Sequence, residues 1–296
     1  MQRHAPAKIN LGLRILDRRD DGYHELESLF APLDLGDEVE VEVSEAAALD
    51  VTIEVGGANE GVPADSSNLA FRAATRFAET AGLRGRIRLR VVKRIPTGAG
   101  LGGGSSDAGA VLRALHELFP DALDRSALSE LALDLGADVP FFLDPRPAIV
   151  RGIGERIEPL KGLPALAVLL ANPGIPLATA DVYAAFDAIQ PALTESSSKP
   201  TIPPLPGAMG HGWNFEEVAG LGLENDLEPI AVRLCPPVAR LRERVRASGA
   251  RAAGMSGSGP TVFGLFDSTS AAEVALARVN FEAPTWARVA TTLDSR

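Results

Sequence analysis

The chain has 296 residues, which is enough for one large domain or two ordinary ones. Its content of 46% hydrophobic and 23% charged residues is typical of a soluble globular protein. A net charge of −10 argues against a broad nucleic-acid surface or an anionic membrane as the partner, and no apolar stretch reaches the length of a membrane span. A small anionic ligand remains compatible, because backbone amides and one or two cations can hold a phosphate.

Cysteine usage and the N-terminus both predict a cytoplasmic protein. The single cysteine, Cys235, cannot form an internal disulfide, and no Cys/His cluster indicates structural zinc. The N-terminal "MQRHAPAKINLGL" lacks the long apolar core of a secretory signal. We expect a small-molecule partner, with no nucleic acid and no membrane, and a monomer or weak homodimer.

The first half of the chain mixes strand and helix patterns. Residues 7–15 alternate between apolar and polar types, which predicts a half-buried strand with Lys8 and Asn10 on its polar face. Other alternating segments predict strands, and segments with helical spacing and capping residues predict helices. The strands are expected at 37–45, 49–57 and 86–95, and the helices at 65–83, at 106–119 and from 125 to a stop at Gly136.

The second half begins with a predicted strand at 165–174 and a helix at 179–189. Residues 190–212 are rich in proline, serine and glycine and predict an exposed loop. The remaining predicted elements are helix at 227–249 interrupted by prolines, a strand at 260–266, a helix at 270–279 and a strand at 286–293. This order predicts two mixed α/β domains, 1–155 and 156–296, joined near residues 150–163.

The most informative stretch is "PTGAGLGGGSSDAG", which runs from Pro96 to Gly109. It contains G-x-G-x-x-G, but a dinucleotide site needs a strand ending in an acidic residue about twenty positions on, where this sequence has turn and helix. A P-loop needs lysine directly after the last glycine, and here Gly104 is followed by two serines. The remaining interpretation is a strand, a glycine loop around an anion, and a helix whose N-terminus faces that anion. A flexible linker is the alternative, and it rarely lies between a strand and a well-patterned helix.

This stretch resembles the nucleotide loop of the GHMP kinases, the superfamily of galactokinase and of homoserine, mevalonate and phosphomevalonate kinases. "PAKINLGLRI" resembles the first motif of that superfamily and "GMSGSGPTVFGLF" its third. "DGYHELES" and "GADVPFFL" are similar to the branch that phosphorylates a cytidylylated methylerythritol. The resemblance implies an α+β, two-domain GHMP kinase fold, with an N-terminal ribosomal-protein-S5-like α/β domain and a C-terminal ferredoxin-like α/β sandwich.

The resemblance also implies a reaction, in which ATP donates its γ-phosphoryl group to the 2-hydroxyl of the acceptor in the non-mevalonate route to isoprenoid precursors. Asp138 would accept the hydroxyl proton, and Lys8 would lower the pKa of Asp138 and stabilise the transition state. The residues alone favour an ordinary turn aspartate at Asp138 and an ordinary solvated lysine at Lys8, and it is the resemblance that reverses this. The residues expected to hold ATP are Pro96, Thr97, Gly98, Ala99, Gly100, Leu101, Gly102, Gly103, Gly104, Ser105 and Ser106.

Acceptor binding is expected, again by resemblance, from residues outside the glycine loop. Asn10 would hydrogen-bond the acceptor, His24 would read the cytosine edge, and Tyr23 and Tyr183 would stack on the ring, with Thr179 as a further contact. Magnesium is expected to arrive with ATP, with no protein metal ligand. Asp107 stands where the motif of many relatives has asparagine; there a carboxylate suits the helix dipole but would repel phosphate if it pointed inward.

Overall fold

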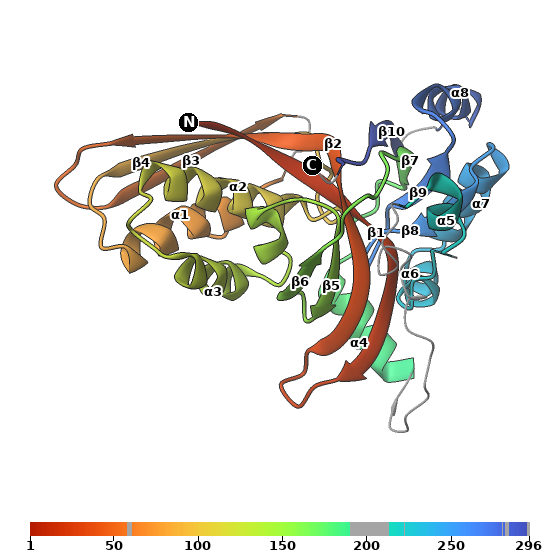
Figure 1. Ribbon diagram of the computed structural model, residues 1–296, viewed down its shortest axis with the longest axis horizontal. Helices are drawn as coiled ribbons and strands as arrows, with labels where there is room; N and C mark the ends of the chain where they lie inside the picture. The colour runs from red at the N-terminus through yellow and green to blue at the C-terminus, as the bar shows by residue number, and fades with distance from the viewer. Residues whose placement is uncertain (58–60, 190–212, 222, 280, 282–283, 295–296) are drawn as a thin grey trace. The chain divides into compact units, whose positions relative to one another are not determined.

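The computed structural model of the chain describes residues 1–57, 61–189, 213–221, 223–279, 281 and 284–294. The chain forms two compact units that interleave along the sequence. Unit 1 comprises Met1–Ala7, Leu35–Thr97 and Gly102–Pro145, and unit 2 comprises Lys8–Asp34, Gly98–Leu101 and Arg146–Arg296. They interleave because two long paired strands, β1 (Gln2–Arg18) and β2 (His24–Ser44), each contribute residues to both units (Figure 1). The predicted domains 1–155 and 156–296 are continuous in the sequence, whereas these two units are not. The domain boundary at 155/156 stays a prediction.

Unit 1 is a small sheet covered by helices. The second half of β2 pairs antiparallel with β4 (Arg86–Lys93), and β3 (Asp50–Gly57) pairs parallel with β4. The helical elements are α1 (Leu69–Thr80), α2 (Gly103–Leu118), α3 (Arg125–Leu135) and the 3-10 helix η1 (Pro140–Leu143). Apolar side chains of the sheet and of these helices share one buried core, as the alternating and helical patterns of the sequence predict.

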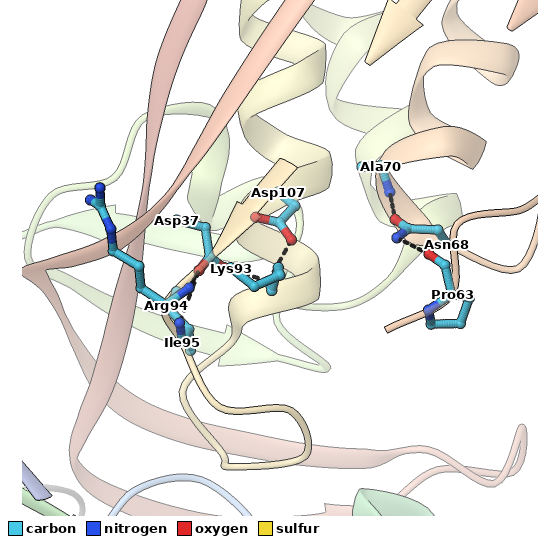
Figure 2. A network of polar contacts seen from close by, with 8 residues as sticks. All are labelled: Asp37, Pro63, Asn68, Ala70, Lys93, Arg94, Ile95 and Asp107. Carbon is cyan, nitrogen blue, oxygen red and sulfur yellow. Dashed lines mark hydrogen bonds and ion pairs between the residues drawn. The ribbon is translucent and has the colours of Figure 1, made fainter. Parts of the chain in front are cut away.

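The first helix of unit 1 shows why the sequence folds locally as it does. Asn68 caps α1, because its side-chain oxygen accepts from the backbone N–H of Ala70 at 2.9 Å and its amide donates to the carbonyl of Pro63 at 2.7 Å (Figure 2). Ala70, Ala73, Ala74, Phe77 and Ala78 recur at helical spacing and are buried. The small size of the four alanines lets α1 pack closely on α2, the helix that follows the glycine loop.

Unit 2 contains a four-stranded antiparallel sheet with the strand order β10-β7-β9-β8. Its strands are β7 (Ala167–Asn172), β8 (Ala252–Met255), β9 (Val262–Phe266) and β10 (Trp286–Thr291). Helices α4 (Thr179–Ile189), α5 (Phe215–Ala219), α6 (Glu228–Leu234) and α7 (Pro237–Ala247) lie in the chain between β7 and β8, and α8 (Thr269–Val279) lies between β9 and β10. This βαββαβ order confirms the expected ferredoxin-like sandwich.

One face of this sheet is covered by both of its main helices. Alternation places Ala167, Leu169 and Ala171 on the same face of β7. The first two pack with α8, and the third belongs to the core that includes α7. A two-layer arrangement follows, with the sheet as one layer and α7 and α8 as the other.

Several local predictions can be compared with the structure. The segment expected to join the domains, 150–163, contains most of a hairpin, β5 (Ala148–Gly152) and β6 (Arg156–Pro159), and β5 pairs with β2. Strand β1 is buried on both faces over 5–11 rather than half-buried. The prolines at 236 and 237 separate α6 from α7, as their interruption of the helical pattern predicted. The predicted loop 190–212 lies outside the described residues.

Candidate active site

The glycine loop has the backbone conformation that its composition predicted. Gly98, Gly100 and Gly102 have φ angles of 62°, 73° and 71°, in the left-handed region that favours glycine. Gly100 also has no room for a side chain, because a Cβ there would lie 2.3 Å from the carbonyl oxygen of Ser256. Both reasons for glycine, positive φ and close backbone approach, are therefore present in this loop.

Helix α2 starts at Gly103, earlier than the predicted start near Ser106. Its N-cap, Gly102, has no side chain to satisfy the first N–H groups of the helix, and Ser105 and Ser106 lie in the first turn rather than at the cap. Such a glycine-capped N-terminus presents backbone donors and the positive end of the helix dipole to an anion. The Ser106 hydroxyl is buried, and no described residue hydrogen-bonds to it.

Lys8 and Asn10 belong to a buried polar cluster in unit 2. The ammonium of Lys8 donates to Oδ1 of Asn10 at 2.7 Å and lies 4.5 Å from the centre of the Phe30 ring. The amide of Asn10 donates to Oγ of Ser28 at 2.8 Å, and that hydroxyl donates to the carbonyl of Gly12 at 2.6 Å. Lys8 is only 4% exposed, so it is held in place and is not the solvated lysine that strand pattern alone suggests.

The same cluster joins the first motif to two glycine loops. The backbone N–H of Lys8 donates to the carbonyl of Leu101 at 3.0 Å. Oγ of Ser256 donates to the carbonyl of Gly100 at 2.9 Å and accepts from the backbone N–H of Asn10 at 3.3 Å. Ser256 belongs to Gly254–Pro260, the second of these two loops. We call it the third glycine loop because it lies in the third sequence motif. The three motifs that the sequence singled out thus meet in one hydrogen-bonded cluster within unit 2.

Asp138 lies in unit 1, in the short turn between α3 and η1, and is half-buried. Gly136 ends α3 and Pro140 begins η1, so the turn that carries the carboxylate is short and confined. Lys8 belongs to unit 2, and the pairing of these two residues stays a prediction from the family resemblance.

Three of the residues expected to bind the acceptor, His24, Thr179 and Tyr183, lie on or against α4 in unit 2. The His24 and Tyr183 rings lie 5.0 Å apart at an interplanar angle of 31°. Thr179, at the start of α4, hydrogen-bonds through its hydroxyl with that of Ser258 in the third glycine loop at 2.9 Å. Tyr23 is 57% exposed, which leaves its ring open to solvent.

Asp187 is a site residue that sequence reasoning missed. Its Oδ1 lies 2.7 Å from Nε2 of His24, whose side chain is only 5% exposed. Asp187 follows Tyr183 by four positions on α4, so both lie on the helix face that meets His24. The four-residue spacing between Tyr183 and Asp187 is the sequence signal that could have placed Asp187 beside His24. An ionised carboxylate only accepts, so a hydrogen bond between Asp187 and His24 requires a proton on Nε2 of the ring.

The described residues contain no group of three or more His, Cys, Asp or Glu side chains placed to hold a metal ion. A metal carried by ATP therefore stays a prediction. Among the helices of the described ranges, none is long and apolar enough to cross a membrane.

Known proteins match this chain along most of its length. A family model of the GHMP kinases N terminal domain matches residues 68–144, and one of the GHMP kinases C terminal region matches residues 213–284. The 4-diphosphocytidyl-2-C-methyl-D-erythritol kinase of Geobacter sp. (strain M21) is 42% identical over 279 residues, 94% of each chain.

Solved structures agree with these matches. A crystal structure of 4-(cytidine 5'-diphospho)-2C-methyl-D-erythritol kinase superposes with a TM-score of 0.77 at 39% identity, covering 99% of this chain and all of the other. Homoserine kinase from Cytophaga hutchinsonii gives a TM-score of 0.74 at 21% identity, covering 99% of this chain and 94% of the other, and shows the shared fold. The chain therefore belongs to the GHMP kinase family, and within it to the group of 4-diphosphocytidyl-2-C-methyl-D-erythritol kinases.

Proposed function

We propose that the protein transfers the γ-phosphoryl group of ATP to the 2-hydroxyl of 4-diphosphocytidyl-2-C-methyl-D-erythritol, giving ADP and the 2-phosphate. The observation that carries this proposal is the match to kinases of that name over nearly the whole chain, 42% identical across 94% of both sequences. The hydrogen-bonded cluster of the first motif with the two glycine loops supports it, because phosphoryl transfer depends on positioning and on donors fixed in advance.

The proposed binding of ATP uses backbone groups of residues 98–106. Positive φ angles turn the loop around an anion, and the uncapped first turn of α2 supplies N–H donors. Magnesium brought with ATP would neutralise charge on the transferring group. The roles of Pro96 through Ser106 in holding the nucleotide rest on this loop geometry and on the family resemblance.

The proposed chemistry assigns one task to each catalytic residue. Asp138 accepts the proton of the 2-hydroxyl as the oxygen attacks the γ-phosphorus. Lys8 places a fixed positive charge where negative charge develops, and its hydrogen bond with Asn10 holds it there. Burial strengthens this effect, because the charge acts in surroundings of lower dielectric than water.

The proposed recognition of cytosine follows from the contact between His24 and Asp187. In the neutral tautomer whose Nε2 proton faces Asp187, Nδ1 is an acceptor. Cytosine carries an amino donor on its Watson–Crick edge where uracil carries a carbonyl acceptor, so an acceptor nitrogen favours cytosine. Tyr23 and Tyr183 would stack on the base, and Thr179 would border the acceptor.

A competition experiment tests this recognition. CMP and UMP are compared as inhibitors against 4-diphosphocytidyl-2-C-methyl-D-erythritol at fixed Mg·ATP. We expect CMP to inhibit at least about tenfold better than UMP, and Asp187→Asn to narrow the difference. Equal inhibition by both nucleotides in the wild-type protein would remove His24 from base recognition. We also propose that the reaction takes place in the cytoplasm, and the single, unpaired cysteine supports this.

A further inference from the structure

A buried ionic network lies beside the glycine loop in unit 1 (Figure 2). Lys93 is the last residue of β4, and its ammonium donates to Oδ2 of Asp37 and, at 2.6 Å, to Oδ2 of Asp107. The side chains of Lys93, Asp37 and Asp107 are 4%, 0% and 4% exposed. Lys93 thus meets two carboxylates in the interior of unit 1.

The network holds the chain on both sides of the glycine loop. The other oxygen of Asp37, Oδ1, accepts from the backbone N–H of Arg94 and from that of Ile95, the latter at 2.9 Å. These are the last residues before the loop. Asp107 lies on α2, directly after the loop. One lysine and two carboxylates therefore join the segment that enters the loop to the helix that leaves it.

The start of α2 also packs directly on the end of β4. A Cβ at Gly103 would lie 3.0 Å from Cγ2 of Ile95 and 3.5 Å from the ammonium of Lys93. A cation at the positive end of a helix is unfavourable by itself, and Asp37 and Asp107 offset that charge. The carboxylate of Asp107 therefore has a cationic partner, Lys93, in the interior of unit 1.

Stability alone is a weak reason for such a network. Buried ion pairs often contribute no more than well-packed apolar residues of the same size, because removing the charges from water is costly. Buried ion pairs can instead fix the geometry of the chain, since each hydrogen bond holds one segment in a defined position. The network has four hydrogen bonds: two from the backbone N–H groups before the loop to Asp37, one from Lys93 to Asp107 on α2, and one from Lys93 to Asp37 that links the two sides.

We propose that Asp37, Lys93 and Asp107 are positioning residues that fix both ends of the glycine loop and so set the affinity of the protein for ATP. The proposal rests on the proposed function only in taking Mg·ATP as the ligand of the loop. Direct binding therefore tests it, whichever acceptor the enzyme uses.

Lys93→Met is the first variant, because methionine fills similar space and makes neither hydrogen bond. The dissociation constant of a nonhydrolysable ATP analogue with Mg²⁺ is measured by calorimetry, beside the KM for the acceptor. We expect binding of the analogue to weaken by about tenfold or more, with the KM for the acceptor changed by less than about twofold. Leu131→Ala is the matched control: Leu131 is buried on α3 of the same unit and has no part in the network. It should destabilise the unit and leave analogue binding at the wild-type value.

A second pair of variants keeps the test decisive if Lys93→Met does not fold. Asp107→Leu removes only the link to α2 and leaves Lys93 with Asp37, whereas Asp107→Asn keeps an oxygen that can accept from Lys93. We expect the leucine variant to bind the analogue at least about fivefold more weakly and the asparagine variant to stay within about twofold of wild type. Wild-type affinity in Lys93→Met or Asp107→Leu, or an equal loss in Leu131→Ala, would overturn the proposal.

Discussion

Asp107 should make the stability of the protein fall as the pH rises from acid toward neutral. Burial, together with the nearby Asp37 carboxylate and against the opposing charge of Lys93, raises the pKa of Asp107 from 3.8 to about 7. Between these values the folded protein holds a proton on Asp107 that the unfolded chain has released. The folded pKa is the higher one, so this contribution is complete below about pH 4 and is lost as the pH rises to about 7.

The size of the effect follows from one proton. A difference of one bound proton changes the free energy of unfolding by about 1.4 kcal/mol per pH unit. The free energy of unfolding of the wild type minus that of Asp107→Asn should therefore fall by roughly 3 kcal/mol between pH 4.5 and 6.5. The side-chain amide that Asp107→Asn introduces does not titrate, so changes common to both proteins cancel in the difference.

Urea unfolding at several pH values measures this difference. Both tryptophans, Trp213 and Trp286, lie in unit 2, so circular dichroism or hydrogen exchange of α2 amides is the better probe of unit 1. Asp50→Asn, which removes an exposed carboxylate from β3 of the same unit, controls for the loss of one negative charge. A wild-type-minus-variant difference that stays constant over this pH range would refute the role assigned to burial and to Asp37.

Three further substitutions test the site. Lys8→Met should lower kcat by about 10²–10³ while the affinity for Mg·ATP stays within about threefold, measured by steady-state kinetics and calorimetry; a kcat near wild type would contradict its catalytic role. Asp187→Asn should raise the KM for the cytidylylated acceptor by roughly tenfold and leave the KM for ATP unchanged, because Asp187 holds His24 and pairs with Arg18 on the acceptor side of unit 2. Gly100→Ala should weaken ATP binding and lower stability by about 1–3 kcal/mol, since its Cβ would meet the third glycine loop at 2.3 Å. Gly82→Ala, with a similar φ of 63° and no atom within 4 Å, should retain ATP binding and separates backbone strain from the clash.

Local patterns predicted most of the elements and the fold. The alternation in β4, the helical spacing and capping in α1, and the apolar run of β7 are signals within a few residues of each other. The ferredoxin-like order of unit 2 and the family were predicted from the motifs, and both are confirmed. The glycine loop could be recognised from its high glycine content, because glycine is the residue that adopts positive φ most readily.

What local patterns could not predict depends on contacts between distant parts of the chain. In the sequence Lys8 looks like a solvated lysine, but in the structure it is buried. Its cluster depends on a contact between Asn10 and Ser256, which are 246 positions apart. Asp37 and Lys93 are 56 positions apart, and only the folded sheet shows that their charges meet. The contact between His24 and Asp187 spans 163 positions in the same way. Such pairs leave no periodic signal in the sequence.

The central claim is acceptor-specific phosphoryl transfer, and ADP release tests it most directly. Purified protein with Mg·ATP is assayed with 4-diphosphocytidyl-2-C-methyl-D-erythritol, with homoserine, with mevalonate and without acceptor, beside Asp138→Asn under the same conditions. We predict ADP release that requires the cytidylylated acceptor and falls by orders of magnitude in Asp138→Asn. Release that follows homoserine or mevalonate instead, or that persists unchanged in Asp138→Asn, would contradict the account.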